Sequence, residues 1–298
     1  MVSIKFFQRK IKKMKNIDLS NFVGKNVNDV LNKANELFHE NLEGKINAHK
    51  IYSELLEQVP NIYEKVNERA FRGDLRKKIW DCEKFFFWNE KYLSQAGQDK
   101  IIKKMFFNNV KEGFFIEIGA YDGVTGSNCL HFEKIQNWKG IAIEPSKIQF
   151  EKLKKNRKCQ LINKAISSEV KKVEFIEVVE GLTQMSGINN SFYKNNSNII
   201  SNDNNSKTRA TNILTSTFVE IAPKNNKIDY MSIDIEGGEM DLLNSIDFEN
   251  YKIKVISVEN NIPKEQNFQN FFEKKNFIYF DRIGQDEIFY NSNFFKFD

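Results

Sequence analysis

The order of apolar and polar residues from position 92 onward most constrains the fold of this chain. Short apolar runs typical of buried strands occur at residues 114–118, 140–144, 160–163, 172–178, 229–235, 253–259, 277–281 and 287–291. Segments with helical spacing, such as 147–156 and 238–246, lie between the earlier runs. Because alternating strands and helices favour a parallel sheet covered by helices, we predict a doubly wound α/β fold. The last two runs have no helix between them and predict an antiparallel hairpin at one sheet edge.

A separate region with helical periodicity precedes this pattern. Within residues 26–90, apolar side chains recur at spacings of three and four, beginning with Val30 and Ala34. We therefore divide the chain into a helical N-terminal region, 1–91, and a second domain, 92–298. The N-terminal region is predicted to support packing or homo-oligomerisation and to supply no chemistry.

A polar insertion interrupts the second domain at residues 185–213. The segment is rich in Asn and Ser and has few large apolar side chains. Because such a composition cannot bury much surface, we predict a long, mobile loop there. Its position after the third strand leads us to expect that it forms part of the substrate-binding site.

The composition favours a cytoplasmic protein. The 298 residues are 40% hydrophobic, which is ample for a core. No apolar run approaches the roughly 20 residues that span a bilayer. The basic N-terminus lacks the apolar segment and cleavage site of a signal peptide. The three cysteines, Cys82, Cys129 and Cys159, are widely spaced and fit free thiols in a reducing compartment better than a disulfide framework or a zinc site.

The first strand run leads directly into a glycine turn. Gly119 and Gly123 are four positions apart, and Tyr121 occupies the position of the second glycine in the dinucleotide fingerprint, so a pyrophosphate turn is not matched. An acid two residues before the first glycine, Glu117, suits the positive charges of S-adenosylmethionine instead. Glu144 ends the next strand run, 21 residues beyond Gly123, where a carboxylate can accept hydrogen bonds from both ribose hydroxyls. Together these features predict S-adenosylmethionine as the cofactor.

Several stretches of the second domain resemble the FkbM-type S-adenosylmethionine-dependent methyltransferases. They include the glycine turn with its following Ser-Asn and the signature Asp-x-Glu-Gly-x-Glu, which begins at Asp234. The stretches lie at residues 94–102, 114–134, 140–145, 228–243 and 256–261. The likeness covers residues 92 to about 292. The resemblance implies a Rossmann-like methyltransferase fold and O-methylation of a hydroxyl, often on a sugar or polyketide.

The predicted cofactor site combines the glycine turn with residues on either side of it. Ser127 and Asn128 begin the next helix and either cap it or approach the cofactor carboxylate. Gln98 precedes the first strand run and is expected to close over the methionine end. The complete predicted set is Gln98, Glu117, Gly119, Ala120, Asp122, Gly123, Ser127, Asn128, Glu144 and Ala165.

Polar residues end two neighbouring strand runs later in the domain. Asp234 and Glu236 follow one run, and the next run ends with Glu259 before Asn260. Because ligands of doubly wound sheets bind at the carboxyl ends of the strands, we expect these side chains to converge beside the methyl donor. Two alternatives follow. One carboxylate acts as a general base on the acceptor hydroxyl, with His131 as a weaker candidate, or Mg²⁺ or Mn²⁺ binds between Asp234, Glu259 and Asn260.

This layout is similar to that of catechol O-methyltransferase, which holds Mg²⁺ at such a position. In that enzyme a lysine lies three residues after the aspartate, whereas Gly237 occupies that position here, so the base must differ. Glu239 is assigned to the N-terminus of the following helix, where acids are favoured.

The acceptor that the resemblance implies is a small-molecule or nucleotide-linked sugar or glycan. The Asn- and Lys-rich composition is associated with bacterial sequences, whose relatives often modify surface polysaccharides such as capsule. Two other functions stay open: an RNA methyltransferase, suggested by the basic N-terminus, and a catalytically silent binding protein that keeps the fold. The segment 260–264, Asn-Asn-Ile-Pro-Lys, follows the wrong strand for methylation of DNA bases and lacks the required aromatic residue, so no DNA partner is expected.

Overall fold

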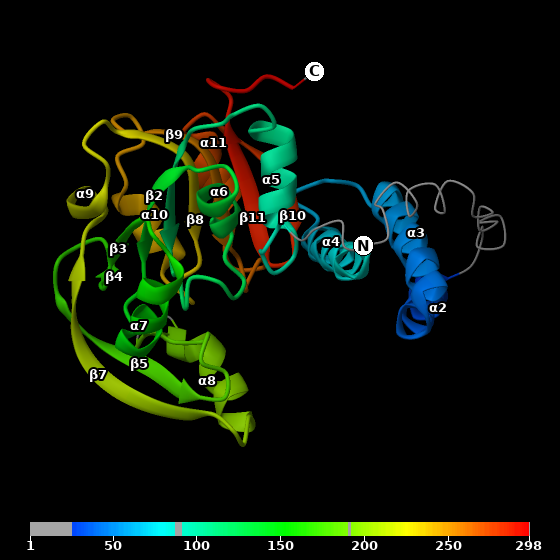
Figure 1. Cartoon of the computed structure of the whole chain (residues 1–298), viewed down its shortest axis with the longest axis horizontal. Coiled ribbons are helices and arrows are strands. Elements are labelled where there is room, and N and C mark those ends of the chain that lie inside the picture. The colour runs from blue at the N-terminus through cyan, green and yellow to red at the C-terminus, as the bar shows by residue number, and fades with distance from the viewer. Residues whose placement is uncertain (1–25, 87–90, 190–191, 298) are drawn as a thin grey trace.

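The computed structural model describes residues 26–86, 91–189 and 192–297, with the backbone alone at 192–195. Its described residues contain a seven-stranded sheet with the order β10-β11-β9-β8-β1-β2-β3 (Figure 1). The strands are β1 (Phe114–Ile118), β2 (Lys139–Ile143), β3 (Gln160–Ile162), β8 (Lys227–Ile233), β9 (Lys252–Glu259), β10 (Phe277–Ile283) and β11 (Asp286–Asn291). Strands β9, β8, β1, β2 and β3 run parallel, and β11 pairs antiparallel with both β9 and β10. The predicted α/β class is confirmed.

Helices cover both faces of this sheet. Successive side chains of a strand point to opposite faces, so Ile116 of β1 packs with Leu242 and Phe272 on one face, whereas Phe115 packs with Phe132 on the other. The helices on the first face are α9 (Phe218–Ile221), α10 (Glu239–Ser245) and α11 (Phe268–Glu273). Those on the second face are α5 (Gln98–Phe106), α6 (Leu130–Lys134) and α7 (Lys147–Asn156). The core therefore lies in two layers, one on each side of the central strands.

A second sheet lies beside the first and contains most of the predicted loop. Its order is β4-β7-β5-β6. The elements are β4 (Ala165–Ile166), β5 (Lys172–Glu180), β6 (Gly187–Ile188), helix α8 (Phe192–Asn202) and β7 (Lys207–Ser216). The prediction of a long loop at 185–213 is wrong, because β7 pairs antiparallel with almost the whole of β5 and its backbone groups are bonded despite the polar side chains. The run at 172–178 likewise belongs to this second sheet and not to the main one.

In the described part of the N-terminal region, three helices follow one another. They are α2 (Val27–His39), α3 (Leu42–Gln58) and α4 (Val66–Phe85). Asn26 and Asn41 accept hydrogen bonds from the first N–H groups of α2 and α3, which explains where these helices begin. Helix α4 packs between α3 and strand β10 (Figure 1). Arg72 and Arg76 of α4 both form ion pairs with Asp281 of β10, so α4 is fastened to the main sheet.

The basic segment at the start of the chain lies outside the described residues. Across the ranges that are described, no helix is both long and apolar enough to cross a membrane.

Candidate active site

The glycine turn brings the ends of β1 and β8 into backbone contact. Gly119 has a φ of +91°, and a Cβ atom there would lie 1.6 Å from the carbonyl oxygen of Asp234. Any side chain would therefore push the two strand ends apart. The N–H groups of Gly119 and Ala120 both donate to the carbonyl of Ile143, at 3.0 and 2.9 Å, which joins β2 to the same turn. The turn thus gathers the carboxyl ends of three neighbouring strands.

The second glycine of the turn and its neighbour Asp122 pack within the protein. Gly123 has a φ of +82°, and a Cβ atom there would lie 2.6 Å from Leu153 Cδ1 and 2.7 Å from Arg157 Cγ. Asp122 Oδ1 accepts a hydrogen bond from the N–H of Thr125 at 2.7 Å. Both residues were predicted to contact the cofactor, but neither lines the cavity at the strand ends.

Glu144 lies directly after β2, where two backbone N–H groups hold its carboxylate. Oε2 accepts a hydrogen bond from the N–H of Tyr121 at 2.9 Å, and Oε1 accepts one from the N–H of Ser146 at 2.7 Å. Burial raises the pKa of this carboxyl to about 7, although both hydrogen bonds act to lower it. An ionised carboxylate oxygen accepts more than one hydrogen bond, so Glu144 retains acceptor capacity toward the cavity that it lines.

Glu117 forms a buried ion pair that sequence reasoning missed. Its Oε2 lies 2.7 Å from Nη1 of Arg157, and its Oε1 accepts a hydrogen bond from the Ser127 hydroxyl at 2.7 Å. Arg157 directly follows α7 and also binds Glu133. Because its charge is balanced inside the protein, Glu117 brings little net negative charge to the cavity. This pairing differs from the predicted role of meeting the positive charge of the cofactor.

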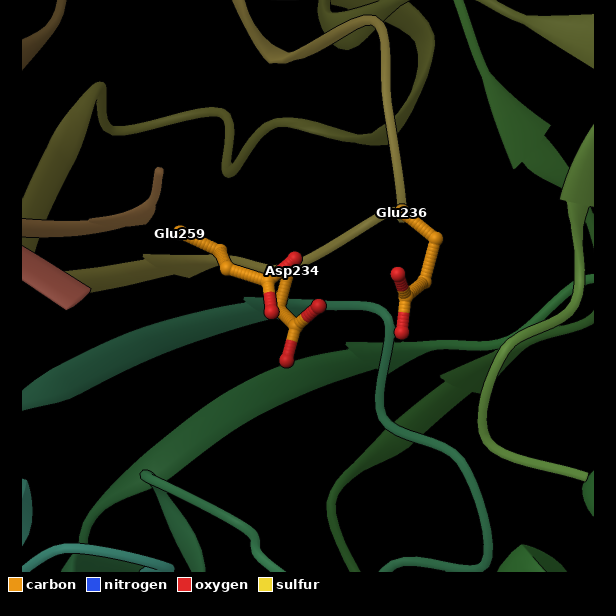
Figure 2. Close-up of side chains that lie close together, drawn as sticks. All are labelled: Asp234, Glu236 and Glu259. Carbon is orange, nitrogen blue, oxygen red and sulfur yellow. The ribbon is translucent and has the colours of Figure 1, made fainter. Parts of the chain in front are cut away.

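Three carboxylates of the described residues meet where β8 and β9 end, and Figure 2 shows their arrangement. Asp234, Glu236 and Glu259 each offer an oxygen atom within 4.8 Å of the others. Burial and then the repulsion of neighbouring carboxylates raise the pKa of Asp234 and of Glu259 well above their ordinary values. Lys164 is the only lysine or arginine among the described residues that line the cavity. The cavity wall therefore carries an excess of acidic side chains.

Glu236 has an unusual backbone conformation, and its side chain contacts helix α8. Its φ is +59°, in the left-handed region that few residues other than glycine adopt. Glu236 Oε2 accepts a hydrogen bond from Nδ2 of the buried Asn196 at 2.9 Å. Burial raises the pKa of Glu236 to about 7 against the lowering effect of this bond. Glu239 instead accepts the N–H of Gly237 at 2.8 Å, in agreement with its predicted place at the start of α10.

Asn260 does not join the acid cluster, which corrects its prediction as a metal ligand. Its side chain is fully buried, and its Nδ2 donates to Glu287 Oε1 of β11 at 3.0 Å. Because side chains alternate along a strand, Asn260 points away from the cavity that Glu259 lines. This alternation can be read from the sequence and could have excluded Asn260 as a metal ligand beside Glu259. Glu236 completes the cluster instead.

His131 and Gln98 also lie outside the cavity lining. Nδ1 of His131 is 2.5 Å from the carbonyl oxygen of Lys91, and its ring stacks on Tyr92 with the centroids 4.4 Å apart. Burial lowers the pKa of His131. Gln98 Nε2 donates to Asp286 Oδ2 at 3.0 Å. His131 is therefore not placed to act as a base on an acceptor in the cavity.

The glycine turn, Glu144 and the acid cluster all line one cavity of about 650 Å³, within the usual range of small-molecule sites. Seven of the ten predicted cofactor residues line it: Glu117, Gly119, Ala120, Ser127, Asn128, Glu144 and Ala165. The second sheet and α8 add Phe175, Ile188 and Asn196 to the wall. Sequence reasoning did not single out these residues, because the polar composition of 185–213 concealed two strands and a helix and the run that contains Phe175 was assigned to the main sheet.

The fold and the site define an α/β protein with an acid-lined cavity at the carboxyl ends of its parallel strands. The family model of the methyltransferase FkbM domain matches residues 117–283, which contain the glycine turn, Glu144 and the acid cluster. The chain belongs to the FkbM methyltransferase family, and the predicted resemblance is confirmed. Membership of this family supports a methyltransferase.

Comparison with solved structures also finds similar chains. The chain is similar to the methyltransferase FkbM from Methylobacillus flagellatus KT, with a TM-score of 0.40 and 9% sequence identity. The similarity covers 80% of this chain and 57% of that chain, so this protein spans less than two thirds of the length of its neighbour. A search of curated proteins found no match.

Proposed function

We propose that the protein transfers a methyl group from S-adenosylmethionine to a hydroxyl of a sugar or glycan-type acceptor, in the biosynthesis of a bacterial surface polysaccharide. One observation carries the proposal: a single cavity is lined both by the glycine turn of the seven-stranded sheet and by a cluster of carboxylates. A hydroxyl needs alignment with the methyl donor and a group that promotes loss of its proton. The two parts of this cavity supply these two requirements.

The wall formed by β1 and β2 fits S-adenosylmethionine. Glu144 keeps acceptor capacity for the ribose hydroxyls, and Gly119 exposes backbone without a side chain. The excess of acidic side chains on the wall suits a cationic cofactor, whose charge favours their ionised form. When bound, S-adenosylmethionine supplies an electrophilic methyl group together with its own leaving group.

The acid cluster fits Mg²⁺ or Mn²⁺. These hard cations take oxygen ligands, and Asp234, Glu236 and Glu259 bring carboxylate oxygens within 4.8 Å of one another. Glu259 is buried, and its Oε2 has no hydrogen-bond partner among the described residues. When bound, such a cation lowers the pKa of a hydroxyl that it contacts. The raised pKa values of Asp234 and Glu259 also suit a carboxylate that accepts the hydroxyl proton directly.

The experiment that tests the proposal incubates the protein with labelled S-adenosylmethionine and a panel of nucleotide-sugars and glycans, in EDTA and with added Mg²⁺ or Mn²⁺. Asp234→Asn and Glu259→Gln should each lose most of the transfer while cofactor affinity, measured by calorimetry, stays close to that of the wild type. Glu249→Gln changes an exposed glutamate and serves as the control. Full activity in EDTA with both cluster variants inactive would exclude the cation and leave a carboxylate base. Full activity in both variants would refute the role of the cluster.

A further inference from the structure

Helix α4 contacts the turn that forms one side of the candidate active site. Gly284, between β10 and β11, donates its N–H to the carbonyl of Gly73 at 3.0 Å. A Cβ atom on Gly73 would lie 2.2 Å from the carbonyl oxygen of Gly284, so the two backbones meet where only glycine fits. The next residue, Gln285, lines the cavity, and its carbonyl accepts the N–H of Asn260 at 3.0 Å. A single turn therefore separates α4 from the cavity.

Arg69 of α4 enters the core beside β11. It is 1% exposed, and its Nε lies 2.9 Å from Oε1 of Glu287. Glu287 is itself fully buried and accepts a hydrogen bond from the Tyr63 hydroxyl at 2.7 Å. Arg282 Nη1 lies 3.2 Å from the same carboxylate. Because a buried charge that loses its partner is strongly disfavoured, these contacts define the position of Glu287.

Glu287 in turn holds the residue next to the proposed catalytic acid. It accepts a hydrogen bond from Asn260 Nδ2 at 3.0 Å, and Arg282 Nη2 donates to the Asn260 carbonyl at 2.9 Å. Together with the bond to Gln285, the N–H, the carbonyl and the side chain of Asn260 are all held by the β10–β11 hairpin. Besides its hydrogen bond with Asp234, Glu259 has one oxygen, Oε2, with no hydrogen-bond partner among the described residues, so the backbone at this strand end contributes to the orientation of the side chain.

We propose that Arg69 is a positioning residue for Glu259, acting through Glu287 and Asn260. Helix α4 then helps to position an active-site side chain in addition to its packing role. The inference rests on the role of Glu259 in the proposed function. It goes beyond the expectation that residues 1–91 supply only packing or assembly.

The test compares Arg69→Met with Arg76→Met in the full chain. Arg76 belongs to the same helix but pairs with Asp281, so its loss removes a more exposed ion pair at a different place. Hydrogen–deuterium exchange at the Asn260 amide should be about tenfold faster in Arg69→Met and unchanged in Arg76→Met. In the methyl-transfer assay, kcat of Arg69→Met should fall by about 10–100-fold with the KM for S-adenosylmethionine unchanged.

Arg69→Lys keeps the positive charge and provides a second variant that can be measured if Arg69→Met does not fold. It should lie between the wild type and Arg69→Met in both measurements, with Arg76→Lys as its control. Unchanged exchange at Asn260 in the Arg69 variants, or equal acceleration in the Arg76 variants, would overturn the positioning role. A wild type that transfers no methyl group would refute the proposed function alone, because the exchange comparison still decides whether Arg69 positions this strand end.

Discussion

Glu236→Gln should make the ligand-free protein more stable. Glu236 is one of the three carboxylates that the described residues bring within 4.8 Å, and its ionisation is opposed first by burial and then by the charge of Glu239. Its hydrogen bond from Asn196 Nδ2, at 2.9 Å, can be accepted equally by the side-chain oxygen of a glutamine. The substitution therefore removes a charge whose burial is unfavourable and conserves the shape of the side chain and the contact with α8.

The magnitude follows from the pKa of Glu236, which burial raises from 4.5 to about 7. At about 1.4 kcal/mol per unit, ionisation of this carboxyl destabilises the folded state by up to about 3 kcal/mol. Because the folded state holds the proton more tightly, this loss of stability develops as the pH rises from about 4.5 to 7. Solvent screening at a half-buried site reduces the effect, and we expect a gain of about 1–2 kcal/mol near pH 8 and none near pH 4.

Urea unfolding in EDTA measures this difference at both pH values, and Glu249→Gln controls for the change in net charge. With Mn²⁺ at about 100 times its Kd, the wild type should gain about 2.7 kcal/mol, and the variant should gain less because it has lost a ligand. Mn²⁺ should therefore reduce the stability advantage of the variant. Equal stability of the wild type and Glu236→Gln near pH 8 in EDTA would refute the argument from the cost of a buried charge. If the variant is more stable than the wild type by the same amount near pH 4, the stabilisation does not come from the loss of the ionised carboxylate.

Glu144→Ala should weaken S-adenosylmethionine binding by about 1.5–3 kcal/mol, and calorimetry that finds wild-type affinity would remove Glu144 from the ribose role. Arg157→Met should destabilise the protein to urea by about 3–5 kcal/mol, because it leaves the buried Glu117 unpaired. Adding Glu117→Gln should restore part of that loss, and no recovery would contradict the ion-pair explanation. Gly119→Ala should abolish cofactor binding or folding, since its Cβ would lie 1.6 Å from the carbonyl of Asp234. A folded Gly119→Ala protein with normal binding would show that the strand ends separate freely.

Local patterns in the sequence were sufficient for several parts of the fold and the site. The helix predicted at 147–156 is α7, because Ser146 caps its first turn and its apolar residues recur with helical spacing. The glycine turn after β1 could be predicted because Gly119 and Gly123 fit a sharp turn with closely packed backbone, which other residues do not. Asp234 and Glu259 could be brought together because parallel neighbouring strands end at the same edge of a sheet.

The tertiary structure alone decided features that depend on partners far apart in the chain. Arg157 balances the charge of Glu117 across forty residues, and Arg69 reaches Glu287 from the N-terminal region, contacts that no local pattern encodes. The second sheet formed from a polar segment because backbone pairing with β5 satisfies the hydrogen bonds of β7 whatever its side chains are. Sequence by itself thus determined most elements of the main sheet and where the acids lie along them. Packing determined which charges are paired, which way each side chain faces and which elements enclose the cavity, because these depend on contacts that exist only in the folded chain.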